Sequence, residues 1–451
     1  MENLTFRKGG IHPNDNKLSA SCKIEVLPVP DVVYVSLSQH IGAPAKAVVA
    51  VGDEVKVGQV IAEPGGFVSA YIHSPVSGMV KSIAPRADIA GNMVTHIEIK
   101  TEGDEWKEDI DRSTTLVTKI PADPAQIIDR IYKCGVVGLG GATFPTHVKL
   151  TPPPGKKAEC LIINGAECEP YLTCDNRIMI ERSSCIVVGT ALISHALGDC
   201  PAVIAVEENK TEAIMKLSSA LHTLQRTEHL GENITVKVLK KKYPQGGEKQ
   251  LIDAVMHRQV PSGKLPIDVG AVVQNVATAL AVYDAVQKNQ PLITNVMTVT
   301  GNCLLVHRNY QFRIGTPLSF IAEAAGGVPA MAAKIISGGP MMGRPVANLS
   351  ATTVKGTSSL LYLTSEVTSR RMETSCIRCG RCVDACPMGL EPYLMFKLAR
   401  VSDMAALEDN SVFDCIECGS CQYTCPAGVP LLDLIRPAKA DVMKIIKSRK
   451  K

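Results

Sequence analysis

The sequence predicts a multidomain α/β protein built from four successive modules, and three observations carry this prediction. Residues from about 31 to 105 alternate apolar and polar side chains between glycine turns. Residues from about 121 to 290 alternate helix and strand signals, and a cysteine pattern occurs twice after residue 367. A chain of 451 residues has room for about three or four domains of ordinary size. Its 45% hydrophobic content is sufficient for packed cores.

The first module, residues 31–105, follows an N-terminal segment of residues 1–30. Its glycines, at Gly52, Gly58 and Gly78, separate short segments with the period-two pattern of β-strands. The two halves of this pattern resemble the barrel-sandwich hybrid, or hammerhead, fold of biotinyl and lipoyl domains. Those carriers hold their prosthetic group on a lysine at a hairpin tip, and residues 58–75 contain no lysine. We therefore expect a structural or docking module.

The second module, residues 121–290, is predicted to be a largely parallel sheet covered by helices, because strand and helix signals alternate along it. Asp123 followed by Pro124 is typical of a helix start. We expect strands at 160–164, 202–206, 234–239 and 270–274, and helices at 125–132, 183–197, 211–224, after Gly247 and up to Val286.

A small β-rich module is predicted for residues 291–365, with strands at 298–301, 311–315 and 334–337 and a helix at 317–325. Residues 367–435 form the cysteine-rich module. Residues 436–451 form a basic tail. For its last stretch, residues 443–451, we expect a solvated, frayed end, with contact to anionic lipid or an acidic partner as the alternative.

The two cysteine runs share the spacing C-x2-C-x2-C-x3-C-P, which resembles that of ferredoxins with two [4Fe–4S] clusters. Zinc sites offer a weaker match, since they combine two C-x2-C doublets rather than a triplet and a lone cysteine before proline. The resemblance implies that the last cysteine of each run ligates the other cluster. The predicted ligand sets are Cys376, Cys379, Cys382 and Cys425 for one cluster, and Cys415, Cys418, Cys421 and Cys386 for the other.

Composition excludes several classes of protein. A net charge of +4 argues against nucleic acid as the main partner. The sequence opens without the pattern of a signal peptide and has no run of about eighteen apolar residues. Together with the iron–sulfur pattern, these features lead us to expect a reducing cytoplasm.

A glycine-rich loop at 138–149 is the second chemical feature. Its Gly138, Gly140 and Gly141 let backbone N–H groups approach a phosphate, and Lys149 supplies a positive charge. The loop is not a G-x-G-x-x-G fingerprint, and a helix rather than a strand precedes it. Alone, it fits a phosphate site and an ordinary tight turn equally well. Three further segments that adjoin strand ends carry suitable polar groups, at 164–170, 243–248 and 274–278.

These segments resemble the flavin and NADH pocket of the flavoprotein subunit of respiratory complex I. The two full cysteine runs, the hammerhead region and the opening residues 6–13 depart from that flavoprotein. They resemble instead the C subunit of the Rnf-type ion-translocating electron transport complex, over nearly the whole chain. This resemblance implies a Rossmann-like FMN/NADH domain at 121–290, a soluble-ligand-binding β-grasp (SLBB-type) domain at 291–365 and an α-helical two-cluster ferredoxin-like domain at 367–435.

The same resemblance implies roles for individual residues. FMN would bind non-covalently, its phosphate near Gly138, Gly140, Gly141 and Lys149, and its ring or ribityl chain near Asn164, Glu167, Asn275 and Thr278. The NADH site would be formed by Phe144, Glu169 and Glu248, and Gly247 would be a further cofactor-binding residue. No residue is expected to act as a catalytic acid, base or nucleophile.

The implied activity is that of a translocase component of the NADH:ferredoxin oxidoreductase type. It would pass electrons between NADH and ferredoxin while partner proteins move Na+ or H+. The implied partners are the membrane, flavin and iron–sulfur components of the same complex, namely its A, B, D, E and G subunits, with ferredoxin reached indirectly. The chain would lie on the cytoplasmic side of the bacterial cell membrane as a peripheral component. Two alternatives stay open: a corrinoid reductase of a microcompartment, and an iron–sulfur wire that binds no nucleotide.

The charges of the two cysteine loops also differ. Arg378 and Arg381 lie in the first loop, whereas Glu417 and Ser420 lie in the second. Because positive charge favours the reduced state of a cluster, we expect the first cluster to be the more easily reduced.

Overall fold

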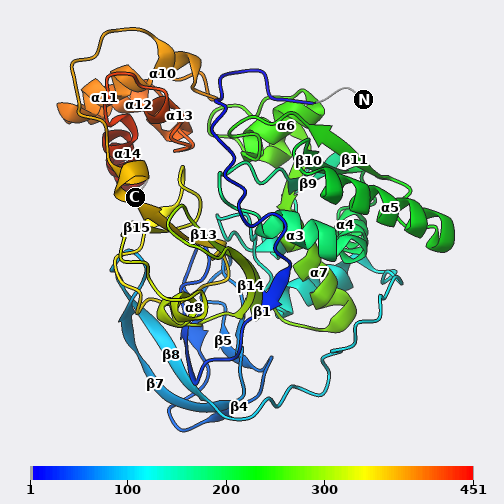
Figure 1. Cartoon of the computed structure of the whole chain (residues 1–451). Coiled ribbons are helices and arrows are strands. Elements are labelled where there is room, and N and C mark those ends of the chain that lie inside the picture. Colours follow the sequence, from blue (N-terminus) through cyan, green and yellow to red (C-terminus); the bar gives the residue numbers. More distant parts are fainter. Residues whose placement is uncertain (1–3, 450–451) are drawn as a thin grey trace.

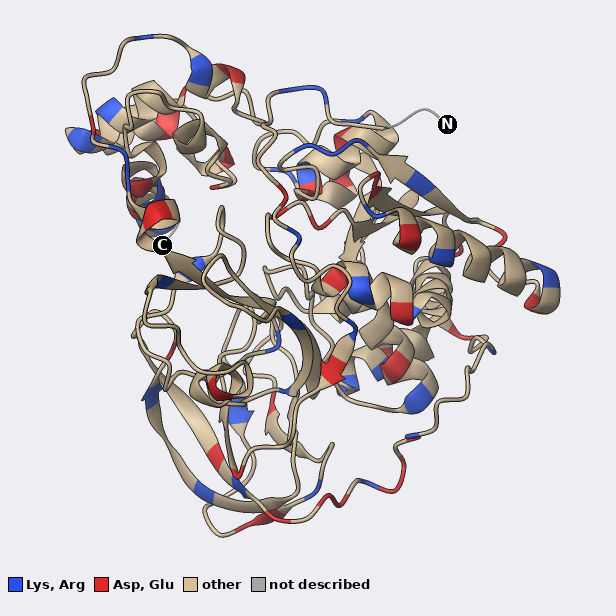
Figure 2. Ribbon diagram, in the orientation of Figure 1, with Lys and Arg blue, Asp and Glu red and all other residues tan. Residues whose placement is uncertain are grey.

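The structure is a computed structural model, and it describes residues 4–449 (Figure 1). The described chain folds into a barrel-sandwich module, an α/β domain, a β-grasp domain and a helical cysteine-rich domain. The predicted fold class is therefore confirmed. Acidic and basic side chains are interspersed over all four parts (Figure 2).

The barrel-sandwich module consists of two antiparallel sheets, with strand orders β2-β8-β7-β4 and β3-β5-β6. Alternate residues of β2 and β8, including Val33, Val35, Ile97 and Ile99, are fully buried between the sheets. This burial explains the period-two pattern. The strands are β2 (Val32–Ser36), β3 (Lys46–Ala47), β4 (Glu54–Val55), β5 (Val60–Glu63), β6 (Ile72–His73), β7 (Gly78–Ala87) and β8 (Met93–Thr101).

The α/β domain has a parallel sheet of order β11-β10-β9-β12, as predicted. Its first helix begins where expected, because the Asp123 side chain accepts a hydrogen bond from the Ala125 N–H. The strands are β9 (Cys160–Gly165), β10 (Ala202–Glu207), β11 (Ile234–Leu239) and β12 (Ala271–Asn275). The α-helices are α1 (Pro124–Lys133), α2 (Thr146–Lys149), α3 (Cys174–Glu181), α4 (Ser183–Ala196), α5 (Thr211–Glu228), α6 (Glu248–Met256) and α7 (Val276–Lys288).

The β-grasp domain contains a mixed sheet of order β1-β14-β13-β17-β15-β16. Its edge strand β1 (Ile24–Val26) comes from the N-terminal segment and pairs in parallel with β14, which sequence reasoning missed. The other elements are β13 (Thr294–Thr300), β14 (Arg308–Arg313), α8 (Leu318–Ala324), β15 (Ala332–Ser337), β16 (Arg344–Pro345), β17 (Ser359–Thr364) and α9 (Ser365–Thr368).

The cysteine-rich domain is helical, and its last helix corrects one expectation. Residues 443–449 are not frayed, since they belong to α14 (Leu431–Arg449), and residues 450–451 lie outside the described part of the chain. Arg436 and Lys439 from this helix bind the Glu417 carboxylate, with N···O distances of 2.8 and 3.0 Å. The helix also buries an apolar face in the core of this domain, made of Leu431, Ile435, Ala438 and Val442, so packing and ion pairs together hold it. The other α-helices are α10 (Arg381–Asp384), α11 (Pro392–Arg400), α12 (Met404–Asp409) and α13 (Ser420–Tyr423).

Residues 4–22, which we call the N-terminal strap, run between the cysteine-rich domain and the α/β domain (Figure 1). Leu4 pairs with Leu239 at the end of β11, and Ile11 pairs with Tyr243. The Gly10 N–H donates to the carbonyl of Ala385, at 3.0 Å. The strap therefore contacts both domains before it enters the β-grasp sheet as β1.

Within residues 4–449, no single helix has both the length and the apolar character needed to cross a membrane. The pair α3–α4 meets these criteria only when its two helices are counted together, and its axes are bent by 94°.

Candidate functional site

Two asparagines mark the carboxyl edge of the parallel sheet. Asn164 on β9 lies directly opposite Asn275 on β12 in the strand register. The side-chain oxygen of Asn275 (Oδ1) accepts a hydrogen bond from the Ala277 N–H and so caps α7. The Asn164 amide donates to the carbonyl of Gly246 at 2.8 Å. The predicted segments around 164, 246 and 275 therefore come together at one edge.

The glycine loop lies against this edge. The Leu139 N–H donates to the Thr278 hydroxyl on α7, at 2.9 Å. Gly140 and Gly141 are exposed, and a Cβ at Gly140 would lie only 3.3 Å from the Asn275 Cβ. Gly141 has a φ of +106°, in the left-handed region that favours glycine. The glycines thus keep a bare, open backbone beside Asn275.

Lys149 and Glu248 form an ion pair beside β12. The Lys149 ammonium lies 2.7 Å from the Glu248 carboxylate and also donates to the carbonyl of Val273. Gly247 precedes Glu248 as the N-cap of α6. The positive charge predicted for a phosphate therefore already has a carboxylate partner in the protein.

Three acidic side chains cluster after β9, and each is held by specific donors. Glu167 accepts hydrogen bonds from the N–H groups of Asp175 and Asn176 at the start of α3. Glu169 accepts from the N–H groups of Met341 and Met342, in a loop of the β-grasp domain. Asp175 accepts from the Asn275 amide at 2.7 Å.

Burial changes the protonation of these acids. Burial raises the pKa of Glu167, and it raises the pKa of both Glu169 and Asp175 to about 7. The Glu167 charge further raises the pKa of Asp175. Two acids of this cluster, Glu169 and Asp175, therefore have a pKa near neutral pH.

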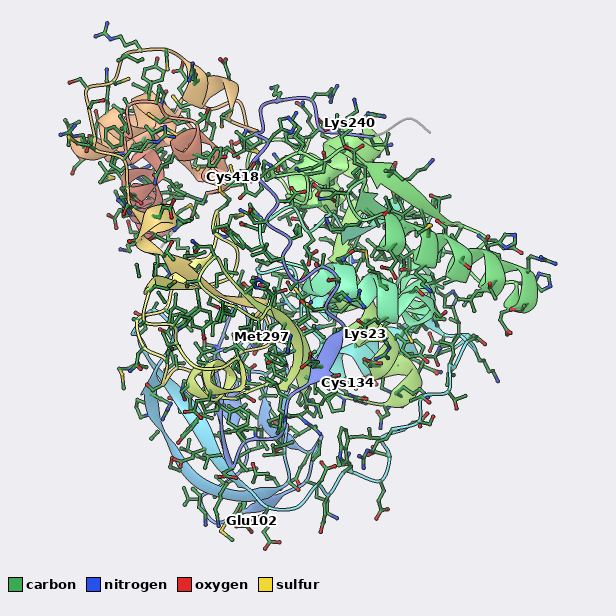
Figure 3. The ribbon with its side chains drawn as sticks, in the orientation of Figure 1. Lys23, Glu102, Cys134, Lys240, Met297 and Cys418 are labelled. Atoms are coloured by element: carbon green, nitrogen blue, oxygen red, sulfur yellow. The ribbon has the colours of Figure 1, made fainter. Side chains whose placement is uncertain are left out.

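Tyr243 connects this region to the cysteine-rich domain. Its buried hydroxyl donates to the carbonyl of Cys418 at 2.8 Å and lies 3.4 Å from the Glu169 carboxylate. Tyr243 also packs with Ile11 of the strap and with Met341. Cys418 accordingly lies where the two domains face each other (Figure 3).

Four of the eight cysteines in the two runs lie around one cavity, and the grouping of the other four stays a prediction. One cavity is lined by Cys386, Cys415, Cys418 and Cys421. Cys382 and Cys425 both pack against the hydrophobic core of this domain, where burial raises the pKa of Cys382, whereas Cys376 and Cys379 are exposed. Among residues 4–449, no three His, Cys, Asp or Glu side chains are arranged around a single metal ion. The four cysteines that line the cavity match the number of thiolate ligands that a [4Fe–4S] cluster takes.

The structure modifies the roles expected of several residues. Gly138 donates its N–H to the carbonyl of Phe144, so both residues shape the glycine loop. The carboxylates of Glu167 and Glu169 are engaged by backbone donors of the protein. Sequence reasoning missed Tyr243, Asp175 and Lys17 of the strap as parts of the site. The only signal for them was their place in or beside polar segments, since burial cannot be read from a single sequence.

The bare glycine backbone, the paired asparagines and the cavity between four cysteines fit a bound phosphate-bearing flavin and an iron–sulfur cluster. Comparisons with protein families agree. Residues 131–284 match the Nuo51 FMN-binding domain, residues 4–104 the RnfC barrel sandwich hybrid domain, residues 296–345 the SLBB domain, and residues 372–429 the 4Fe-4S dicluster domain. FMN and [4Fe–4S] clusters are therefore the cofactors of this chain.

Curated relatives cover most of the sequence. The chain is 44% identical to the C subunit of the proton-translocating ferredoxin:NAD(+) oxidoreductase complex of Clostridium ljungdahlii, over 86% of this chain and 83% of the relative. It is 41% identical to the C subunit of the Na(+)-translocating ferredoxin:NAD(+) oxidoreductase complex of Acetobacterium woodii, over 97% of each. The chain belongs to the RnfC family.

RnfC proteins are components of multi-subunit ion-translocating oxidoreductase complexes, as the names of these relatives state. Among solved structures, an NAD+-reducing [NiFe]-hydrogenase in the H2-reduced state matches with a TM-score of 0.50 and 20% identity. The match covers 71% of this chain and 63% of the hydrogenase chain. A likeness at this level of identity concerns the fold.

Proposed function

We propose that this RnfC protein passes electrons between NADH and a ferredoxin-linked one-electron chain. It does so as a peripheral component on the cytoplasmic face of a membrane complex whose other proteins move Na+ or H+. The observation that carries this proposal is the contact between the two sites. The Tyr243 hydroxyl reaches from the carboxyl edge of the flavin domain to the carbonyl of the cluster ligand Cys418.

The need for both a flavin and iron–sulfur clusters follows from the chemistry of the electron carriers. When bound, FMN accepts two electrons as a hydride from NADH and releases them one at a time to a cluster. The protein must therefore hold a nucleotide pocket and a one-electron relay close together. The cysteine group 386, 415, 418 and 421 lines the cavity nearest to Tyr243, so we assign it to the cluster that receives electrons first.

The glycine loop is the proposed binding surface for the flavin phosphate. Gly140 and Gly141 leave room for the ligand, and Gly138 and Thr278 fix the loop. The Lys149 ammonium would interact with the phosphate while it keeps its ion pair with Glu248. Phe144 and Gly247 border the proposed NADH site.

The two asparagines and the acidic groups would shape the rest of the pocket. In both asparagines the side-chain NH2 donates one hydrogen bond to the protein and the side-chain oxygen accepts one from a backbone N–H. Their position on neighbouring strands leaves them facing the same edge. Glu167 and Glu169 would act mainly by holding the loop that follows β9, because their oxygens accept backbone hydrogen bonds.

An anaerobic titration with NADH tests the proposal. The purified, cluster-loaded chain should bind FMN, and added NADH should bleach the flavin absorbance and then reduce the clusters. If FMN does not bind, or if the clusters respond only to dithionite, the chain is an iron–sulfur wire and the nucleotide assignment is wrong.

Cysteine variants test the ligand sets in the same preparation. Cys386→Ser should perturb the electron paramagnetic resonance signal of the cluster held by residues 415–421, and Cys425→Ser that of the other. Cys22→Ser, outside both cysteine runs, serves as the control and should leave both signals unchanged. Loss of the same signal in both test variants would contradict the cross-pairing.

A further inference from the structure

One ammonium group from the N-terminal strap holds the loop that follows β9. The Lys17 Nζ donates hydrogen bonds to the carbonyls of Glu167, Glu169 and Leu172, at 2.8, 2.9 and 2.7 Å. A lysine ammonium has three N–H donors, and all three are used here. Burial of this group lowers the pKa of Lys17. A buried ammonium whose three N–H groups all donate to backbone carbonyls is a specific structural contact, unlike that of a mobile surface lysine.

The loop around this ammonium is strained. Glu167 and Tyr171 have φ values of +45° and +70°, in the left-handed region that side chains other than glycine rarely adopt. Such conformations persist only where surrounding contacts impose them. Three carbonyl oxygens that converge on one point would also repel one another without a donor between them. Lys17 supplies that donor, so the loop depends on the strap for its shape.

Further contacts fix the strap in register with the loop. The Tyr171 N–H donates to the carbonyl of Asp15 at 2.9 Å. The hydroxyls of Ser19 and Thr173 lie 2.6 Å apart. Lys17 therefore lies between two residues, Asp15 and Ser19, that are hydrogen-bonded to the loop. These contacts restrict the conformational freedom with which its ammonium reaches the carbonyls.

We propose that Lys17 is a positioning residue for the nucleotide site. It acts through the backbone of residues 167–172 and holds Glu167 at the start of α3 and Glu169 beneath the Met341–Met342 loop. This role rests on the proposed function, because the proposed function places the loop of residues 167–172 in the FMN and NADH pocket. The strap thereby becomes part of the nucleotide site although it lies more than a hundred residues before the loop in the sequence.

Two substitutions and one control test this role in the full, cluster-loaded chain. Lys17→Met removes all three donors, whereas Lys17→Arg keeps a cation with N–H donors. Lys23→Met changes an exposed lysine just beyond the strap that has no side-chain hydrogen bond or ion pair among the described residues. The first readout is hydrogen–deuterium exchange of amides 166–173 without added FMN. The second is the Kd for FMN, followed by the KM and kcat for NADH with ferricyanide as acceptor.

We expect faster exchange at residues 166–173 in Lys17→Met. We also expect its Kd for FMN and its KM for NADH to rise at least about tenfold, as suits the loss of charge-assisted hydrogen bonds. The kcat should change far less, and the cluster signals should stay as in the wild type. Lys17→Arg should give exchange rates and a Kd for FMN between those of the wild type and Lys17→Met. Lys23→Met should match the wild type.

Unchanged exchange and unchanged FMN affinity in Lys17→Met would overturn the positioning role while the proposed function stands. Loss of the cluster signals together with FMN in both Lys17 variants would also overturn it, because Lys17 would then support folding in general. Failure of the wild-type chain to bind FMN would remove the proposed function and, with it, this inference.

Discussion

Asp175 provides a quantitative test of the electrostatics of the site. Its carboxylate is packed against Asn275 and near Glu167, and burial raises its pKa to about 7 from an ordinary value of 3.8. Between these two pH values, the folded protein holds a proton that the unfolded chain has released. The folded state therefore binds more protons than the unfolded state, and the free energy of unfolding falls as pH rises through this window.

The size of the effect follows from the pKa difference. Since one pKa unit corresponds to about 1.4 kcal/mol, the difference between about 7 and 3.8 corresponds to at most about 4 kcal/mol above pH 7. Asp175 keeps partial contact with solvent, so we expect about half of that, roughly 2 kcal/mol. Asp175→Asn removes the charge and keeps an oxygen that accepts from the Asn275 amide. The variant should match the wild type near pH 4 and exceed its stability at pH 8.

Urea unfolding followed by far-UV circular dichroism at pH 4 to 8 measures this difference. A gain of about 2 kcal/mol would move the midpoint by about 1 M if the urea dependence is about 2 kcal/mol/M. Asp129→Asn is the control, because Asp129 is an exposed helical residue paired with Lys133. Parallel pH profiles for the wild type and Asp175→Asn would refute the reasoning.

Two more predictions concern buried groups between domains. Tyr243→Phe removes the hydroxyl that donates to Cys418. It should lower the free energy of unfolding by about 1 to 2 kcal/mol. Redox titration should show a shifted reduction potential only for the cluster assigned to Cys415, Cys418 and Cys421. Equal shifts in both clusters would argue against the assignment of Cys418 to that cluster. Lys355 donates to the carbonyls of Tyr71 and Gly135, and burial lowers its pKa to about 7. Because the unfolded chain keeps that proton to about pH 10.5, the wild type should gain stability from pH 7 to 10, on the order of 3 to 4 kcal/mol. Lys355→Met should lack this rise in urea titrations.

Much of the fold could be predicted because hydrophobic periodicity and glycines at turns are local signals in the sequence. The strand at Ile234–Leu239 begins and ends at the predicted residues, and the other sheet strands of the α/β domain differ by about one residue. The helix at Cys174–Glu181 was missed, because its polar residues Asp175, Asn176 and Arg177 hide the apolar pattern. Its polar face is buried against the Glu167 loop, which a propensity argument does not anticipate.

Long-range pairing explains the other misses. The edge strand Ile24–Val26 joins a sheet whose remaining strands lie nearly 300 residues later, and three residues carry no periodic signal of their own. The charge comparison of the two cysteine loops had the same weakness. Glu417 is neutralised by Arg436 and Lys439, so the second loop is less negative than its sequence indicates. The expected order of cluster potentials therefore loses its main support.

The proposed site draws its fixed parts from four regions of the chain. The strap supplies Lys17 to the carbonyls after β9, and the β-grasp domain supplies the N–H groups of Met341 and Met342 to Glu169. The cysteine-rich domain supplies the Cys418 carbonyl to Tyr243. Each of these contacts satisfies a buried polar group that would otherwise cost about 1 to 3 kcal/mol. A shift of the cysteine-rich domain would break the hydrogen bond from Tyr243 to Cys418, next to the Glu169 carboxylate. This coupling gives a physical reason for the two redox sites to be carried by one polypeptide.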